Sequence, residues 1–212
     1  MNFASLIKDY ADLPISRHLI LEVLKGYKRP NDKISALLKS GLLISLKKGL
    51  YVVGPSLGFK LPEPFLIANH LWGPSYVSLD SALSYWGFIP ERVYEVSSVT
   101  LKPSKKYETL VGRFSYKKLQ SAYYSNGIER VKLQNNQSVL MAAPEKALCD
   151  KIVLTPNIYL RSMQQTFEFL TEDLRIDIEL IKKLNTNLMG DWILYAPKKN
   201  SLKMLIKTIN AL

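Results

Sequence analysis

Residues 31–53 constrain the fold most, because the spacing of apolar residues changes abruptly at Gly41 within this stretch. Before the glycine, apolar residues recur at the spacing of one helix face: Ile34, Leu37 and Leu38. We expect Asp32 to cap this helix and Gly41 to end it. The first part of the stretch therefore predicts a short amphipathic helix.

After the glycine, two short apolar runs at residues 42–46 and 50–53 predict the strands of a hairpin. Lys47, Lys48 and Gly49 lie between the runs and give the hairpin a basic tip. Helix, glycine and basic hairpin in this order are typical of the second half of a winged helix-turn-helix. There the helix enters a major groove and the hairpin lysines reach phosphate, so the first hypothesis is a DNA-binding protein.

Two more helices are expected upstream, over residues 3–10 and from Ser16, a plausible N-cap, to Gly26. Three helices and a hairpin within about 53 residues have the size and order of a winged-helix domain. A plain three-helix bundle is the alternative. The lysines of the hairpin favour the winged helix.

The charge distribution supports the same assignment. The chain has a net charge of +11, and residues 25–60 hold eight Lys or Arg against one acid. Residues 61–212 hold nineteen against fourteen, so most of the excess lies on the expected winged helix, as it would on a phosphate-binding surface. A proline- and glycine-rich segment at residues 54–64 is the expected linker. We therefore predict a DNA-binding domain at 1–56 and a larger domain at 57–212.

The larger domain is expected to be α+β. Helices are predicted at residues 65–72 and, with Ser78 or Asp80 as the cap, at 81–86. Four segments have the composition of strands and predict a small antiparallel sheet of three or four strands: 93–102, 113–119, 128–133 and 138–142. Asn126-Gly127 and Asn135-Asn136 are the expected turns.

The C-terminal part of the chain is expected to be helical. Pro144 is expected in the first turn of one helix, and three more are predicted at 158–170, 177–184 and 201–209. Residues 189–197 have the pattern of either a buried segment or a late strand.

The sequence gives little support for an enzyme. His18 and His70 have no partner at metal-binding spacing, and Cys149 is expected to be a small buried side chain. There is no glycine-rich phosphate loop, so no cofactor is expected. The pairs Glu129 with Lys132 and Glu145 with Lys146 are too loosely spaced to predict a metal-dependent nuclease.

Residues 105–124 interleave tyrosines with lysines and an arginine. This composition suits a stacking surface for single-stranded nucleic acid, but it is also typical of a half-buried strand face. The single cysteine, the acids near the N-terminus and the absence of a long apolar run are as expected of a soluble cytoplasmic protein without a signal peptide.

Three segments in this order resemble the AbiEi-type antitoxins of type IV toxin-antitoxin systems: GLLISLKKGLYVV, YVSLDSAL followed by WGFIP, and MAAPEKALCDKI. The resemblance covers residues 16–155. It implies an N-terminal winged helix joined to an antitoxin domain that represses its own operon and counters a nucleotidyltransferase-like toxin encoded nearby. It also implies that a stable complex with the toxin is not required. Family wings often carry arginine where this chain has lysine, so base reading is not expected of the wing.

The leading hypothesis is thus a transcriptional repressor that binds double-stranded DNA at its own promoter and is not an enzyme. Eight residues are expected to contact the DNA: Lys28, Arg29, Asn31, Lys33, Ser35, Lys39, Lys47 and Lys48. Two alternatives are a nuclease-like enzyme positioned by the winged helix and a module that binds a partner protein.

Overall fold

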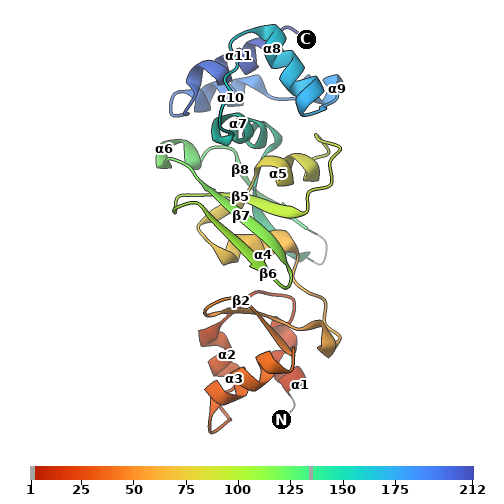
Figure 1. Cartoon of the computed structure of the whole chain (residues 1–212), viewed down its shortest axis with the longest axis vertical. Coiled ribbons are helices and arrows are strands. Elements are labelled where there is room, and N and C mark those ends of the chain that lie inside the picture. Colours follow the sequence, from red (N-terminus) through yellow and green to blue (C-terminus); the bar gives the residue numbers. More distant parts are fainter. Residues whose placement is uncertain (1–2, 134–135) are drawn as a thin grey trace.

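The computed structural model describes residues 3–133 and 136–212 and has an α+β fold, as predicted. Figure 1 shows three layers along its long axis: an N-terminal unit, a central sheet flanked by helices, and a group of C-terminal helices. In the described part of the chain, no helix has the length and apolar character required to span a membrane.

The N-terminal unit has the expected helix, helix, helix, hairpin order, with one additional short strand. Its elements are α1 (Phe3–Ile7), η1 (Lys8–Tyr10), β1 (Ile15–Ser16), α2 (Arg17–Val23), α3 (Pro30–Lys39), β2 (Leu43–Lys47) and β3 (Leu50–Val53). The three strands form an antiparallel sheet in the order β1-β3-β2. This sheet distinguishes a winged helix from a plain three-helix bundle.

The local signals for the helix ends were mostly correct. The Ser16 hydroxyl accepts a hydrogen bond from the backbone N–H of Leu19 and caps α2, as predicted. The prediction that Asp32 caps α3 was wrong: the helix begins at Pro30, and no side chain caps it. Proline is favoured at the first helical position because its fixed φ suits a helix and its missing N–H would have had no partner there.

Gly41 ends α3 as expected, in the left-handed conformation with φ +70°. The N–H of Gly41 donates to the carbonyl of Leu38 at 3.2 Å, and the N–H of Leu42 donates to that of Leu37 at 3.0 Å. This pair of bonds is a Schellman motif, which turns the chain directly into β2.

The linker begins at a close approach between two backbones. A Cβ atom at Gly54 would lie 1.8 Å from the carbonyl oxygen of Gly41, so only glycine fits there. The short helix η2 (Pro55–Leu57) then leads towards the larger domain.

The larger domain contains a mixed six-stranded sheet in the order β6-β7-β5-β4-β9-β8, instead of the small antiparallel sheet that we expected. Its strands are β4 (Ser75–Val77), β5 (Glu95–Thr100), β6 (Lys105–Thr109), β7 (Gly112–Lys118), β8 (Ile128–Lys132) and β9 (Ser138–Ala142). Two neighbouring pairs, β5 with β7 and β4 with β9, are parallel. The turn expected at Asn135-Asn136 lies partly outside the described residues, whereas Gly127 has the positive φ of a turn.

Helices cover the sheet and form the far end of the molecule (Figure 1). They are α4 (Pro64–Leu71), α5 (Leu79–Tyr85), α6 (Ser121–Tyr124), α7 (Pro144–Leu154), α8 (Met163–Glu168), η4 (Phe169–Asp173), α9 (Ile178–Ile181), α10 (Thr186–Ile193) and α11 (Lys199–Ile209). Of residues 189–197, expected to be a buried segment or strand, 189–193 form the end of α10 and 194–197 follow it. The helix expected from residue 158 begins only at Met163, where the Ser162 hydroxyl caps it.

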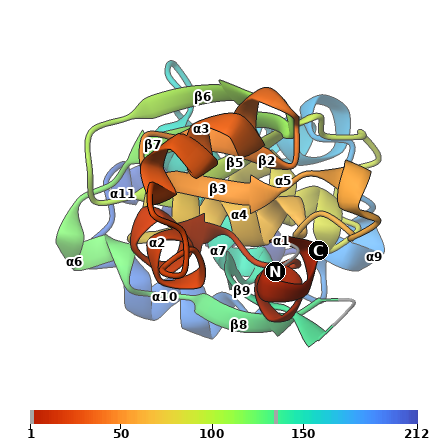
Figure 2. The ribbon, with the colours of Figure 1, turned by 90° about the horizontal axis from the view of Figure 1, so that it is seen from below.

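Strand β3 is buried on both sides because the N-terminal sheet lies between two hydrophobic cores. Tyr51 and Val53 pack with the N-terminal helices, whereas Leu50 and Val52 pack into the core of the larger domain. Viewed from the N-terminal end, β3 crosses in front of α4 (Figure 2). The helix α3 therefore lies on the opposite side of this sheet from the larger domain.

Candidate nucleic-acid interface

The outward face of α3 carries three of the residues expected to contact DNA, spaced four positions apart: Asn31, Ser35 and Lys39. All three are exposed, whereas Ile34 and Leu37 are buried in the N-terminal core. The Ser35 hydroxyl donates a hydrogen bond of 3.1 Å to the backbone carbonyl of Asn31. Successive turns of α3 thus present a row of polar side chains of the kind that contacts base edges in a major groove.

Arg17 lies beside this row, although the sequence pattern did not single it out. Its guanidinium donates a hydrogen bond of 2.8 Å to the side-chain oxygen of Asn31, and both residues are exposed. Arg17 is the first residue of α2, directly after the capping Ser16, and this position is the signal that could have identified it. In helix-turn-helix proteins the first helix crosses the DNA backbone, where a guanidinium can bind phosphate.

The turn before α3 carries two exposed cations, Lys28 and Arg29. Arg29 lies 3.6 Å from the carboxylate of Asp32, but these side chains are 85% and 71% exposed. Such a pair contributes little to stability, so Arg29 is free to exchange its partner for phosphate. Lys33 differs from both: it is half-buried, with its ammonium 5.3 Å from the centre of the Tyr27 ring.

The two lysines of the wing point to different surroundings. The Lys47 ammonium donates a hydrogen bond of 2.5 Å to the carbonyl of Leu71, at the end of α4, and lies 5.8 Å from the centre of the Trp72 ring. Burial and two neighbouring lysines lower the pKa of Lys47. Lys48 is exposed. Lys47 is therefore engaged with the larger domain, and of the two expected phosphate contacts Lys48 is the accessible one.

The tyrosines of residues 105–124 do not form an open stacking surface. Tyr116 and Tyr123 are buried in the core. Tyr107 is half-buried, and its ring packs edge-on against Tyr116 and lies 6.0 Å from Trp72 between ring centres. These tyrosines are therefore part of the packing of the sheet, as expected for a half-buried strand face.

Two of the motifs meet in a buried polar cluster in the larger domain. Asp150 of α7 accepts hydrogen bonds from the hydroxyls of Tyr76 at 2.9 Å and Ser78 at 2.8 Å. The Asp150 carboxylate also lies 2.9 Å from the ammonium of Lys146, and both side chains are fully buried. Lys146 donates a further bond of 3.1 Å to the carbonyl of Tyr123 and lies 3.3 Å from the centre of that ring.

This cluster joins β4 and the start of α5 to α7. Ser78 precedes α5, but its hydroxyl does not cap the helix because it donates to Asp150 instead. Burial raises the pKa of Asp150 and lowers that of Lys146, and the two charges oppose these shifts in each other. Since neither charge reaches solvent, the cluster fixes the packing of these elements rather than contacting a ligand.

The residues considered for catalysis lie apart from one another. Glu145 accepts a hydrogen bond from the backbone N–H of Asn185, whereas the neighbouring Lys146 is in the buried cluster. Cys149 is buried. Within residues 3–133 and 136–212, no group of three or more His, Cys, Asp or Glu side chains is arranged to hold a metal ion.

No protein-family model and no curated protein matches this chain. Among solved structures, the chain is similar to the crystal structure of the RV2827C protein from Mycobacterium tuberculosis, with a TM-score of 0.62 and 14% sequence identity. The similarity covers 97% of this chain and 75% of that one. At this identity the comparison shows the fold alone, over nearly the whole of this chain.

Proposed function

We propose that this protein binds double-stranded DNA through α3 and represses transcription from its own promoter. The observation that carries the proposal is the exposed polar row of α3, with exposed cations beside it. Arg17 and Arg29 lie at the start of the helix, and Lys48 is at the wing. Phosphate contacts beside a helix fix its register and orientation in a groove.

The side chains divide naturally into two roles. Asn31 and Lys39 have the donors and acceptors that read base edges, asparagine on adenine and lysine on guanine. Lys28, Arg29 and Lys48 are surface cations suited to phosphate. Because Lys48 lies on the wing and not on the helix that would enter the groove, we assign it to the DNA backbone and not to a base.

The proposal is tested by measuring binding of the full chain to duplex DNA from upstream of its own gene and to a scrambled duplex, over a range of salt concentrations. Lys48→Ala should weaken binding to both duplexes and reduce the salt slope by about 0.9. Asn31→Ala should mainly reduce the preference for the upstream duplex, by about 1–3 kcal/mol. Lys203→Ala, on an exposed position of α11 at the far end of the molecule, is the matched control.

A flat salt response would refute DNA binding through these cations. An equal effect of Lys203→Ala and Lys48→Ala would refute the assignment to the wing. If Lys48→Ala lowered the preference for the upstream duplex and Asn31→Ala left it unchanged, Lys48 would be the residue that reads bases and Asn31 would not.

The second part of the proposal is that the protein acts in the cytoplasm as an antitoxin against a nucleotidyltransferase-like toxin encoded next to it. Its support is the resemblance of SLDSAL and PEKALCDKI to the antitoxin motifs; these two segments, separated along the chain, meet where Ser78 donates to Asp150. The shared motifs are thus explained together, as one packing unit of the larger domain.

Co-expression with the neighbouring gene tests the antitoxin role. We expect the full chain to restore growth, and the double variant Asn31→Ala/Lys48→Ala to restore it as well, because the larger domain is unaltered. The toxin must be expressed from an unrelated promoter so that repression plays no part. Failure of the wild-type chain to restore growth would refute the antitoxin role while leaving DNA binding intact.

A further inference from the structure

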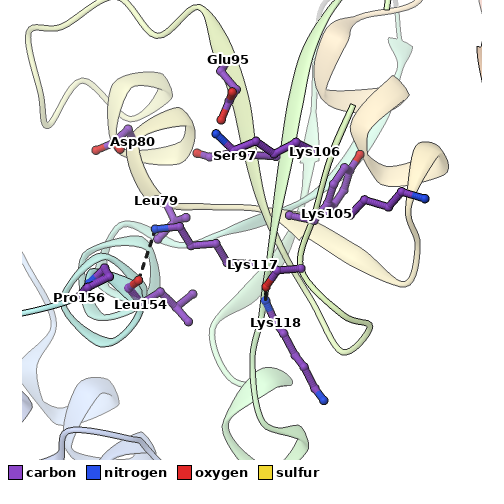
Figure 3. Close-up of a pocket in the computed structure, with 13 residues that line it drawn as sticks. Leu79, Asp80, Glu95, Ser97, Lys105, Lys106, Lys117, Lys118, Leu154 and Pro156 are labelled. Carbon is purple, nitrogen blue, oxygen red and sulfur yellow. Dashed lines mark hydrogen bonds between the residues drawn. The ribbon is translucent and has the colours of Figure 1, made fainter. Parts of the chain in front are cut away.

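A cleft of about 710 Å³ opens on the part of the central sheet formed by β5, β7 and β6. Leu79 and Asp80, at the start of α5, form one wall, and Leu154 and Pro156, at the end of α7, form another. Figure 3 shows these residues around the open strand face. The volume is in the range of sites that hold small molecules.

The floor of the cleft follows from the strand register. Ser115 of β7 pairs with Ser97 of β5 on one side and with Lys106 of β6 on the other. Lys117 lies two positions beyond Ser115, so its side chain leaves the same face of the sheet. Directly opposite residues lie about 5 Å apart, and successive residues on one face about 7 Å apart, so Lys106, Ser115 and Lys117 can reach one group of atoms.

These three side chains have hydrogen-bond donors that the described part of the chain does not use. Ser115 and Lys106 make no side-chain hydrogen bond or ion pair with the described part of the chain, and Ser115 lies on the cleft floor. The Lys117 ammonium has one acceptor, the carbonyl of Leu154 at 3.3 Å, which leaves two of its three hydrogens. Burial and then the nearby Lys151 lower the pKa of Lys117, although Asp80 and Glu95 act in the opposite direction.

The two acids of the cleft do not cancel this charge. Asp80 is already paired with Lys151 at 2.6 Å. Glu95 then faces two lysines alone, and its carboxylate lies on the same side of the cleft as the ammonium of Lys106 (Figure 3). Lys105 and Lys118 also line the cleft, but Figure 3 shows both ammonium groups directed away from it.

We infer that this cleft binds a nucleoside phosphate, with a phosphate group held by Lys106, Ser115 and Lys117. Ammonium and hydroxyl donors on one face of two adjacent strands suit phosphate oxygens. Glu95 is placed to accept hydrogen bonds from sugar hydroxyls, and the walls at Leu79 and Leu154 are apolar, as a base requires. A nucleoside phosphate carries these three kinds of group within one small molecule, and this site is separate from the proposed DNA interface on α3.

The test is a calorimetric titration of the full chain with ATP, tripolyphosphate and adenosine, without metal ions. We expect saturable binding of ATP and tripolyphosphate and none of adenosine at the same concentrations. Lys106→Gln and Lys117→Gln should each weaken ATP binding by about 10-fold or more, because a hydrogen bond to a charged group is lost. Lys118→Gln, on the same strand but directed away, is the matched control and should change it by less than about 2-fold.

Glu95→Gln should change phosphate binding in the opposite direction from the lysine substitutions. Removing its charge should strengthen tripolyphosphate binding, whereas a general loss of folding would weaken it. Three results would overturn the inference: no saturable ATP binding up to about 1 mM, equal binding of adenosine and ATP, or equal effects of Lys118→Gln and Lys117→Gln. Displacement of ATP by the upstream duplex would also overturn it, because the nucleotide would then occupy the DNA surface.

Discussion

The buried pair of Lys146 and Asp150 allows a quantitative prediction about stability. Lys146→Met removes the ammonium but keeps a long apolar side chain, and it leaves the Asp150 carboxylate buried with hydrogen bonds from Tyr76 and Ser78 alone. Breaking a buried pair on one side costs about 3–5 kcal/mol, because the remaining charge stays out of water. In a chain of 212 residues this corresponds to a fall in Tm of roughly 6–20 °C.

Asp150→Asn should cost a similar amount, since the Lys146 ammonium would lose its carboxylate and keep the carbonyl of Tyr123 and the rings of Tyr123 and Tyr76. The double variant Lys146→Met/Asp150→Asn buries no charge. We therefore expect it to be more stable than the sum of the two single losses predicts, by about 1 kcal/mol or more. Urea unfolding, followed by circular dichroism and tryptophan fluorescence, measures all three free energies of unfolding.

The control is Lys151, which directly follows Asp150 in α7. Lys151→Met breaks the pair with Asp80, whose side chains are 20% and 40% exposed, and should cost no more than about 1 kcal/mol. Single losses below about 1 kcal/mol at Lys146 and Asp150, or strict additivity in the double variant, would show that the buried charges are not coupled in the way described.

Three further predictions concern the cores. Burial raises the pKa of Cys149 to about 12, so a disulfide reagent at pH 8 should leave the folded chain unmodified and titrate one thiol only after unfolding in urea. Because this folded pKa exceeds the usual thiol value of 9.0, the contribution of Cys149 to stability is complete below pH 9.0 and is lost as the pH rises towards 12, by up to about 1.4 kcal/mol per pH unit. Cys149→Ala should flatten this loss in urea titrations. A fragment of residues 1–56 should aggregate in size-exclusion chromatography, because Leu46, Leu50 and Val52 lose roughly 4–9 kcal/mol of burial; a monodisperse, folded fragment would contradict the shared sheet.

Local signals predicted the N-terminal unit well because they act between near neighbours in the chain. Ser16 and Gly41 have conformational preferences that hold in almost any context, and both mark helix ends here. Asp32 was wrongly chosen as a cap because two signals competed, and the ring of Pro30 fixed the helix start three residues earlier, with Arg29 at the N-cap position.

The central sheet was harder to predict. Strand β6 reads Lys-Lys-Tyr-Glu-Thr, and its charged residues suit an exposed sheet edge but give no apolar alternation to detect. The parallel pairing of β5 with β7 joins strands separated by β6 in the chain, so it depends on tertiary packing and not on a turn. The sequence indicated four of the six strands but not their order.

The candidate sites show the same limit at the level of single side chains. Lys47 and Lys48 are adjacent and chemically identical, yet one contacts the end of α4 and the other faces solvent. That difference depends on the direction of each side chain from the hairpin and on where the larger domain packs. The cleft could not be predicted from the sequence for a similar reason, since only the pairing of the strands brings Lys106 opposite Ser115.

The sheet shared by the two cores changes how the domain boundary should be understood. The proline-rich segment after Val53 was the expected boundary, because it interrupts regular structure. Packing divides the chain elsewhere: alternate residues of β3 belong to different cores, with Tyr51 on one side and Leu50 and Val52 on the other. A wing hairpin that is buried on both faces cannot swing independently, so contacts made by Lys48 or α3 act on the same packed sheet that supports the larger domain.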